Sequence, residues 1–415
     1  MRIIDLFSGA GGLTFGFYYC KKNNAFVRNR RNSFVFANEF DPHAAMAFST
    51  NYPDITMLNK DIKSLGADFI KEMIGNDPVD LIIGGPPCQS FSTVGQRIYD
   101  EKATLYEEYL RMLNIVRPKM FLFENVKGIL SMKEVFYAHD ADGNILYEIK
   151  ENKNRTSLKP RKKPIIEGYG ELIMDKIHKM FSNIDNTEFG YNIVHKTLNA
   201  IDYGVPENRE RVFIIGIRKD LDIKWCFPEP KRTPPLTIYE AISDLPELQE
   251  GEDIHEYNNP PVNEYQRLMR QNSTHLTHHY CGIYGEKIRM VIENVNQGEG
   301  KNDFNALVDA GIIDEKYRLT SGYANTYGRL VANQPSPTIT NNMTTPSALR
   351  CIHYAQNRAL SPREGARIQS FPDWFEFYGK KAQVTKQIGN AVPPVMAIEI
   401  AKQIEKVLNG VEKNG

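Results

Sequence analysis

The residue with the clearest chemical potential is a cysteine placed directly after an apolar run. Cys88 closes the segment GGPPC at residues 84–88, immediately after the run that ends at Ile83. Because proline fixes φ, the two prolines would hold this thiol on a rigid turn rather than inside a strand. A thiol presented in this way is typical of a nucleophile, whose reactive thiolate form needs a cationic or dipolar neighbour.

A glycine-rich turn near the N-terminus indicates a bound small molecule. The segment DLFSGAGGL at residues 5–13 reads as a strand, a turn and the start of a helix. Glycine lets a ligand approach the backbone closely, and a helix start offers free N–H groups to a carboxylate. Glu39, one strand later, could accept the two hydroxyls of a ribose, as acids do in nucleotide sites. Asp61 could accept the amino group of an adenine.

Two further segments carry groups that could handle protons and negative charge. Glu124 opens the segment ENV at residues 124–126, at the end of another apolar run, where a carboxyl group beside the thiol could move a proton. Arg209 and Arg211 lie in PENRER at residues 206–211. Strand alternation would place both arginines on one face, as a clamp for an anion or a carbonyl group.

Strand and helix patterns alternate through the first 220 residues and must position these groups. The expected strands are Arg2–Leu6, Phe34–Ala37, Val79–Ile83, Met120–Phe123 and Val212–Ile217. Leu105, Tyr109, Leu113 and Val116 have helical spacing, and Pro118 follows them. Such alternation predicts a parallel sheet covered on both faces, which binds ligands at the carboxyl ends of its strands.

The rest of the chain departs from this alternation in two places. Residues 131–168 read as an insertion, with a hairpin turn at 140–143 and six basic residues and no acid between Lys153 and Lys163. This basic run is either a solvated surface loop or a phosphate contact. From residue 219, prolines and polar stretches predict a smaller second domain. The alternation returns in a C-terminal helix that opens at Pro393-Pro394 and is expected to pack on the first domain.

Composition narrows the class of protein. The 415 residues include 51 Lys+Arg and 51 Asp+Glu, so the formal net charge is zero and any nucleic-acid contact would need a local basic face. No apolar run is long enough to cross a bilayer, and no secretory signal is recognisable, so the expected location is the cytoplasm. Five widely spaced cysteines argue against a disulfide framework.

At this point the chain closely resembles the cytosine-5 DNA methyltransferases. The segments that carry the resemblance stand in family order: DLFSGAGGL at 5–13, GGPPCQSFS at 84–92, ENV at 124–126, VPENRERVFIIG at 205–216, PSPTIT at 335–340, LSPREGARIQSFPDWF at 360–375 and QIGNAVPP at 387–394. The resemblance implies an α/β fold, with a Rossmann-like S-adenosylmethionine-dependent methyltransferase domain and a smaller, irregular target-recognition domain. We expect the first at 1–218 plus 345–415 and the second at 219–344.

The resemblance also implies a role for each matching residue. Cys88 would attack carbon 6 of a cytosine flipped from duplex DNA, Glu124 would contact ring nitrogen 3 and the amino group, and Arg211 would hold the carbonyl oxygen, with Arg209 nearby. The residues expected to bind S-adenosylmethionine are Phe7, Ser8, Gly9, Gly11, Gly12, Leu13, Glu39, Phe40, Asp61, Ile62, Pro86, Asn390 and Ala391. Those expected to bind the substrate base are Pro87, Gln89, Ser90, Ser92 and Asn125.

The family pattern is not followed everywhere. Glu207 stands where many members carry glutamine, and the expected lid over the base, from Ser90 to about Thr104, lacks a common arginine. No metal is required, and His275, His278, His279 and Cys281 are expected at DNA contacts or on the surface.

Three functions remain open from the sequence. The favoured one is a monomeric bacterial DNA (cytosine-5)-methyltransferase in restriction–modification, with double-stranded DNA as substrate and a cognate restriction endonuclease as possible partner. The alternatives are a tRNA cytosine-5 methyltransferase and a non-enzymatic DNA-binding regulator. The long region at 219–328 favours DNA over tRNA, and the intact Cys88, Glu124 and Arg211 argue against a decayed regulator.

Overall fold

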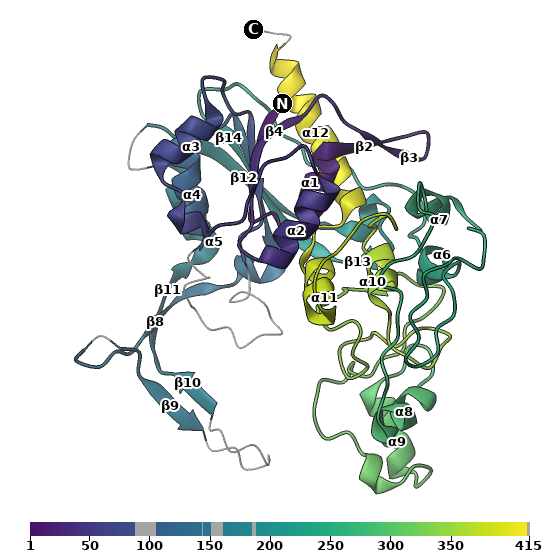
Figure 1. Ribbon diagram of the computed structural model, residues 1–415. Coiled ribbons are helices and arrows are strands. Elements are labelled where there is room, and N and C mark those ends of the chain that lie inside the picture. Colours follow the sequence, from purple (N-terminus) through teal and green to yellow (C-terminus); the bar gives the residue numbers. More distant parts are fainter. Residues whose placement is uncertain (88–104, 143, 151–160, 185–187, 413–415) are drawn as a thin grey trace. The chain divides into compact units, whose positions relative to one another are not determined.

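The computed structural model describes residues 1–87, 105–142, 144–150, 161–184 and 188–412 (Figure 1). Its main sheet has seven strands in the order β12-β14-β7-β6-β1-β4-β5. The chain divides into two compact units. The first comprises Met1–Gly84, Leu198–Glu210 and Ile223–Gly415, and the second comprises Gly85–Thr197 and Arg211–Asp222.

The first unit contains the parallel strands. They are β1 (Arg2–Leu6), β4 (Ser33–Asn38), β5 (Met57–Leu58) and β6 (Leu81–Gly84), with β1 paired to both β4 and β6. Ile3, Ile4 and Leu6 are fully buried, as expected for a strand covered on both faces. The sequence prediction of β1 is confirmed residue for residue, and β4 extends one residue beyond its prediction at each end. The carboxyl ends of these strands therefore share one edge.

Helices connect and cover these strands. Those of the N-terminal part are α1 (Gly12–Tyr18), α2 (Pro42–Asn51), η1 (Ile62–Ser64) and α3 (Ala67–Ile74), beside a hairpin of β2 (Tyr19–Lys22) and β3 (Ala25–Arg28). The C-terminal helix α12 (Pro394–Glu412) packs along α1 and buries Ala397, Ile400 and Ile404. The prediction that this helix returns to the first domain is confirmed.

The region after residue 223 adds short helices with long connections. They are α6 (Ile238–Ile242), α7 (Glu264–Met269), α8 (Glu286–Glu293), α9 (Lys301–Asp309), η6 (Glu315–Tyr317), α10 (Pro362–Ile368) and α11 (Lys381–Asn390). In the chain segment between β12 and β14, η5 (Ala200–Tyr203) precedes β13 (Glu207–Asn208). Strand β13 pairs in parallel with β15 (Ser336–Pro337). A separate smaller domain at 219–344 stays a prediction.

The second unit is built on an antiparallel pair. Strand β7 (Met120–Val126) follows α4 (Leu105–Val116), whose bounds match the predicted helix, and it pairs with β14 (Glu210–Arg218) in antiparallel register. The expectation of a purely parallel sheet was therefore wrong at β14. The chain reaches β14 from β12 (Tyr191–Asn199) through η5 and β13, without the long helical crossover that a parallel neighbour requires. Helix α5 (Ile173–Ser182) precedes β12.

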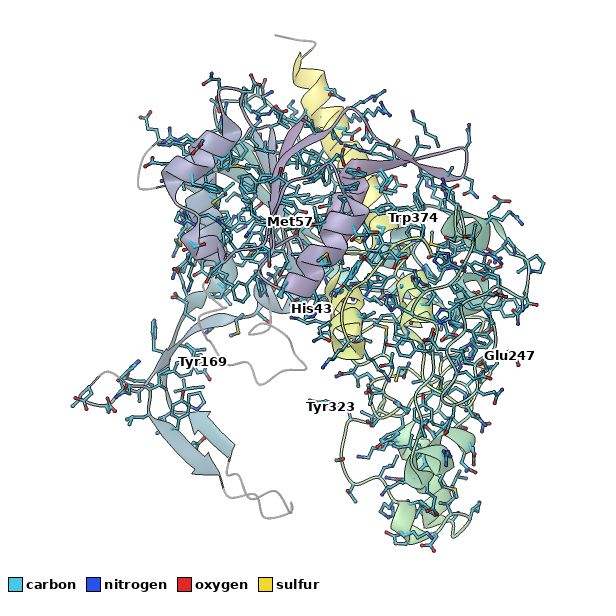
Figure 2. The ribbon with its side chains drawn as sticks, in the orientation of Figure 1. His43, Met57, Tyr169, Glu247, Tyr323 and Trp374 are labelled. Carbon is cyan, nitrogen blue, oxygen red and sulfur yellow. The ribbon has the colours of Figure 1, made fainter. Side chains whose placement is uncertain are left out.

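The predicted insertion forms an arm of two ribbons. The inner ribbon pairs β8 (Lys133–Tyr137) with β11 (Ile166–Leu172), and the outer ribbon pairs β9 (Tyr147–Lys150) with β10 (Arg161–Pro164). Between β8 and β9, Asp140 accepts backbone hydrogen bonds from Asp142 and Asn144 in the predicted turn. Tyr169 lies on the inner ribbon (Figure 2). In the described part of the chain, no helix is long and apolar enough for a membrane span.

Candidate active site

The glycine-rich turn lies at the carboxyl end of β1 and has a constrained backbone. Phe7 adopts φ 56°, in the left-handed region, which costs free energy for a residue other than glycine and recurs at functional sites. Ser8 is buried, and its N–H donates to the carbonyl of Asn38 at 3.0 Å. A Cβ at Gly12 would collide with the carbonyl of Val392 and stand 3.0 Å from the Cβ of Ala391. The start of α1 therefore touches the segment that follows α11 only because residue 12 is glycine.

Glu39 follows β4 and ties the neighbouring loops together. Its Oε2 accepts a hydrogen bond from the N–H of Gly9 at 2.9 Å, and its Oε1 accepts from the N–H of Asp41 at 2.7 Å. Burial raises the pKa of this carboxyl, while the two backbone donors oppose the shift. Predicted residues from the glycine-rich turn and from the end of β4 thus come together at one edge.

The other predicted cofactor residues surround the same edge in different environments. Phe40 is 73% exposed, which is unusual for so large an apolar side chain. Asp61 is exposed and caps η1 through the N–H of Lys63, while Ile62 and Leu13 are buried in the core.

Arg209 is placed differently from the sequence-based expectation of a ligand clamp. Its side chain is fully buried, and its guanidinium donates to the carbonyl oxygens of Ile339, Gly389 and Ala391 at 2.8–3.1 Å. Glu207 lies 3.5 Å from the same guanidinium and accepts the N–H of Ile339 at 2.6 Å. These contacts hold the backbone beside Asn390, which ends α11, so the geometry favours a positioning role for Arg209.

A buried carboxyl that the motif analysis did not single out lies beneath the glycine-rich turn. Asp5 is fully buried in β1 and accepts a hydrogen bond from the hydroxyl of Thr14. Its other oxygen, Oδ1, has no hydrogen-bond partner among the described residues. Burial raises the pKa of Asp5 to about 8; the Thr14 bond opposes this shift and the charge of Glu39 adds to it. Asp5 was not recognised from the sequence because it lies within a strongly apolar strand. An acidic residue in such a strand is the one signal that could have identified it.

The residues of this edge suit a cofactor that contains a nucleoside, such as S-adenosylmethionine. Asp5, with its unpaired oxygen, lies buried beneath them. Glu39 could accept ribose hydroxyls, and the exposed Phe40 offers an apolar face to an adenine. The residues of this edge therefore fit such a group.

The second unit holds a carboxylate–guanidinium pair. Glu124 lies on β7 and Arg211 on β14, where the antiparallel register sets Arg211 opposite Val126 and Phe213 opposite Glu124. Arg211 Nε lies 3.2 Å from Glu124 Oε1, and both side chains are nearly buried, at 13% and 11% exposure. Low water access strengthens such a pair and fixes its orientation.

The turn before Cys88 is attached to the same strand. Asn125 is buried, and its side-chain amide donates to the carbonyl of Pro86 at 3.2 Å. A Cβ at Gly85 would stand 2.8 Å from Glu124 Oε2. Gly85 and Pro86 thus pack against β7, and the contact with Pro86 indicates a positioning role for Asn125. The predicted residues Cys88, Gln89, Ser90 and Ser92, with the predicted lid, lie outside the described residues.

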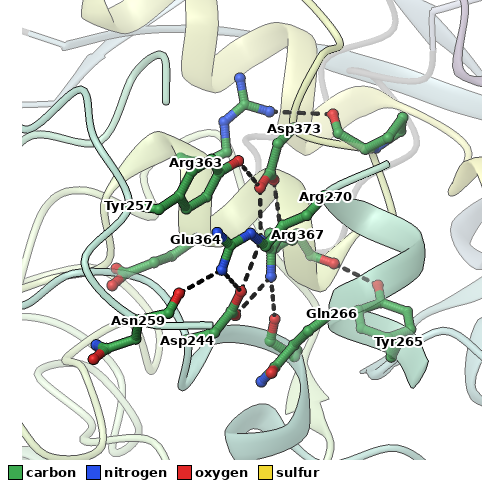
Figure 3. A network of polar contacts seen from close by, with 12 residues as sticks. Asp244, Tyr257, Asn259, Tyr265, Gln266, Arg270, Arg363, Glu364, Arg367 and Asp373 are labelled. Atoms are coloured by element: carbon green, nitrogen blue, oxygen red, sulfur yellow. Dashed lines mark hydrogen bonds and ion pairs between the residues drawn. The ribbon is translucent and has the colours of Figure 1, made fainter. Parts of the chain in front are cut away.

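A buried ionic network connects the region 219–344 to the C-terminal motifs (Figure 3). Arg367 on α10 donates to both carboxylate oxygens of Asp373 at 2.6 Å and to Asp244 at 2.9 Å. Tyr257 donates to Asp373 at 2.5 Å, and Arg270 pairs with Asp244 at 3.3 Å. Burial opposes ionisation of Asp373, but the charge of Arg367 outweighs it and lowers the pKa. Sequence reasoning missed this network because its members are distant in the chain.

Of the residues expected at DNA contacts or on the surface, His279 and Cys281 are buried instead, His278 is partly buried and His275 is exposed. His279 is buried between the hydroxyl of Ser361 and the carbonyl of Pro246, and His278 contacts the carbonyl of Phe377. Burial lowers the pKa of His278 to about 4, so it is neutral at neutral pH.

The chain is similar to known proteins over most of its length. A family model described as C-5 cytosine-specific DNA methylase matches residues 1–143 and 166–406, and leaves out a stretch inside the arm. The chain is 32% identical to the type II methyltransferase M.DdeI of Desulfomicrobium norvegicum, over 97% of this chain and 88% of that protein. It is also 32% identical to the type II methyltransferase M1.HphI of Haemophilus parahaemolyticus, over 98% and 87%.

Solved structures show the same fold. A DNA modification methyltransferase encoded within an Escherichia coli prophage superposes with a TM-score of 0.66 at 25% identity, covering 99% of both chains. The Dnmt2 methyltransferase of Schizosaccharomyces pombe has a TM-score of 0.56 at 15% identity over 99% of both chains, a likeness of fold alone. Because the family model matches most of its length, the chain belongs to the C-5 cytosine-specific DNA methylases.

Proposed function

We propose that this chain is an S-adenosylmethionine-dependent DNA (cytosine-5)-methyltransferase that modifies one short duplex sequence. The observation that carries the proposal is the Glu124–Arg211 pair beside the turn that leads to Cys88. A carboxyl and a guanidinium, held together in a nearly dry environment, match the nitrogen and carbonyl groups of a cytosine edge.

In this proposal the chain's residues activate carbon 5 of the base. The Cys88 thiolate forms a bond to carbon 6, and the π electron pair between carbons 5 and 6 shifts to lie between carbons 4 and 5. The π pair displaced from the bond between carbon 4 and nitrogen 3 takes the proton that Glu124 delivers. Arg211 binds the carbonyl oxygen and keeps the Glu124 carboxyl in the plane of the base. Covalent addition in this way divides a difficult substitution into easier steps.

When bound, S-adenosylmethionine supplies an electrophilic methyl group. The glycine-rich turn, Glu39 and Asp61 bind and orient the nucleoside part, and Arg209 holds the backbone of Asn390 and Ala391 beside it. After methyl transfer, the proton of carbon 5 passes to solvent. The electron pair left at carbon 5 forms the double bond to carbon 6 as the bond to Cys88 breaks, and nitrogen 3 returns its proton to Glu124. These steps regenerate the thiolate and the carboxyl and release 5-methylcytosine.

A cytosine inside a duplex hides the ring that Cys88 must reach, so the proposal includes flipping of the base. The region 219–344 would select the sequence through base edges in the major groove. Because the relatives M.DdeI and M1.HphI are named type II methyltransferases, we propose a role in restriction–modification, with an endonuclease that cuts the same unmethylated site.

The decisive experiment is to incubate the protein with labelled S-adenosylmethionine and mixed-sequence duplex DNA, and to map new 5-methylcytosine by sequencing. We expect methyl groups at one short recurrent site. Transfer to tRNA instead would establish the tRNA alternative, and absence of transfer to either nucleic acid would refute the proposal.

The covalent step has its own test. Duplex carrying 5-fluorocytosine at the mapped site cannot lose a proton from carbon 5, so wild-type protein should remain attached through Cys88. Cys88→Ser should bind cofactor but neither attach nor turn over. Cys226→Ser is the matched control, because Cys226 is an exposed thiol outside the motifs, and this variant should behave as wild type.

A further inference from the structure

The first unit contains a pocket of about 290 Å³ that the proposed chemistry does not use. Its walls include two arginines, two side-chain amides and two prolines, which are Arg329, Arg350, Asn208, Gln334, Pro335 and Pro337. Among the described residues that line this pocket, none is acidic. Its volume is at the lower end of cavities that hold small ligands, so it suits one small group of negative charge.

Arg329 brings to this pocket a positive charge that no acid balances. It is only 7% exposed, and its guanidinium donates five hydrogen bonds at 2.6–2.9 Å. Every acceptor is neutral: the carbonyls of Ile292, Val295, His353 and Gln356, and the side-chain amide of Asn357. In the described part of the chain no carboxylate pairs with Arg329, and burial lowers its pKa. A charge with so little access to water attracts an anion more strongly than one in bulk solvent.

Arg350 supplies donors that are still available. Its side chain is exposed, and no other described residue forms a hydrogen bond or an ion pair with its guanidinium. Its backbone has φ 31°, an unfavourable value for a residue with a Cβ, yet its N–H donates to the carbonyl of Asn325 at 3.2 Å. A Cβ on Gly328 would stand 2.6 Å from Arg350 Cγ, so the side chain lies against a residue that must be small. The fold thus holds Arg350 at the pocket at some cost in backbone free energy, a pattern that recurs at functional sites.

The two amides add neutral donors to the same pocket. The side-chain oxygen of Asn208 accepts a hydrogen bond from Asn199 at 2.7 Å, and no described residue accepts one from its amide N–H groups. Gln334 is exposed, and its side chain likewise has no partner within the described ranges. Guanidinium and amide N–H groups together are the donors that proteins use for phosphate oxygens.

We infer that this pocket binds a phosphate group, and that the backbone of the substrate DNA supplies it. The inference rests on the proposed function in taking DNA as the substrate. Arg350 binds two phosphate oxygens through its planar guanidinium, and the charge of Arg329 strengthens the attraction. Since the formal net charge of the chain is zero, DNA contacts depend on local positive sites such as this one. The contact positions the duplex without reading its sequence.

Two variants test the contact. Arg350→Gln removes the charge of an exposed side chain. Gly328→Ala keeps every charge but displaces the Arg350 side chain, because the new methyl group would occupy the place of its Cγ. The control for the first is Arg30→Gln, since Arg30 is also exposed and precedes β4 at the end of that strand remote from Glu39. The control for the second is Gly410→Ala, where nothing lies within 4 Å of a Cβ.

The first measurement is binding to a mixed-sequence duplex over a range of salt concentrations. One lost phosphate contact removes about 0.9 from the slope of log K against log salt, so both pocket variants should show this loss and both controls should not. A loss in Gly328→Ala would show that the position of Arg350 matters and not the net charge. Thermal unfolding of each variant checks that it is folded. An unchanged slope in Arg350→Gln, whose exposed side chain is not needed for folding, overturns the inference.

The second measurement locates the phosphate. Duplexes that contain the mapped site each carry one neutral methylphosphonate linkage at a different position. Wild-type protein should bind one of these duplexes about tenfold more weakly than unmodified DNA, the effect of losing a hydrogen bond to a charged group. Arg350→Gln should bind that duplex and unmodified DNA equally, because its contact is already lost. Equal sensitivity of wild type and Arg350→Gln at every position contradicts the assignment.

Inorganic phosphate tests the other source of the same group. Thermal unfolding is followed as phosphate replaces chloride at constant ionic strength. If phosphate raised the midpoint of wild type but not of Arg350→Gln, while their DNA slopes were equal, the pocket would take free phosphate and the assignment to DNA would be overturned. Methylation of DNA with unchanged slopes would overturn this inference alone. A lost slope in Arg350→Gln without methylation by wild type would support the pocket and refute the proposed function.

Discussion

Gly85 and Glu124 lie so close that a Cβ on residue 85 would stand 2.8 Å from Glu124 Oε2. The absence of a side chain at residue 85 therefore lets the carboxyl of Glu124, which we propose to be catalytic, occupy the space beside the turn that leads to Cys88. The contacted atom is the end of a flexible side chain, so a larger residue would displace the carboxylate rather than unfold the strand.

Gly85→Ala should reduce kcat with little effect on stability. The new methyl group would push the Glu124 carboxylate away from Arg211 and out of the plane of the base, and a misplaced catalytic group costs about 10²-fold in rate. Steady-state kinetics and thermal unfolding check this together. Gly410→Ala is the control, because nothing lies within 4 Å of a Cβ there. A loss of stability as large as the loss of activity would contradict this account.

Glu124→Gln should lower kcat by about 10²–10³-fold, the usual effect of removing one group that stabilises charge in a transition state. Glutamine keeps the size of the side chain but cannot deliver a proton to the base. The KM for S-adenosylmethionine should not change, since Glu39 and the glycine-rich turn, which we propose to bind it, follow other strands. Glu264→Gln breaks an exposed pair with Arg267 and should leave the kinetics unaltered. A raised cofactor KM in Glu124→Gln would argue against the assigned role.

Arg209→Lys should affect folding and cofactor binding more than chemistry. Lysine cannot reach the carbonyls of Ile339, Gly389 and Ala391 together, and buried acceptors left without a donor cost about 1–3 kcal/mol each. We expect a lower midpoint of unfolding and a higher KM for S-adenosylmethionine, with kcat nearly preserved at saturation. Arg218→Lys, which alters a half-exposed pair with Asp220, is the matched control. A large fall in kcat at saturating cofactor would instead indicate that Arg209 is a catalytic residue.

Asp5 predicts a dependence of stability on pH. Its pKa in the folded protein, about 8, lies above the ordinary value of 3.8 because the carboxyl is buried. The folded state therefore holds a proton that the unfolded state loses first. The resulting stabilisation is complete below about pH 4 and is lost as pH rises towards about 8. Asp5→Asn, which cannot ionise, should gain stability relative to wild type between pH 5 and about pH 8.

Urea unfolding of wild type and Asp5→Asn across this interval measures the difference. Asp54→Asn is the control with the opposite sign: hydrogen bonds from Tyr18 and Arg28 outweigh partial burial and lower the pKa of Asp54. Its contribution is lost only as pH falls below the ordinary value, so its stability difference should be flat from pH 5 to 8. An equally flat difference for Asp5→Asn would show that Asp5 is ionised throughout.

Much of the local structure follows from the sequence because it depends on neighbouring residues. Helical spacing from Leu105 to Val116 and the proline that follows are enough to specify α4, and the apolar run from Arg2 to Leu6 specifies β1. Asp140 and the turn residues after it likewise act over a few positions. The motifs, which are local as well, identified the family that the comparisons show.

The tertiary structure decided which of these residues meet. Glu124 and Arg211 are 87 positions apart, and they form a pair only because β14 runs antiparallel to β7, a pairing that no local propensity encodes. Arg209 and Arg211 look equivalent in a strand pattern, yet the first is enclosed by backbone carbonyls and the second faces a carboxylate. The raised pKa of Asp5 has the same origin, because desolvation depends on everything packed around a group and not on its neighbours in the chain.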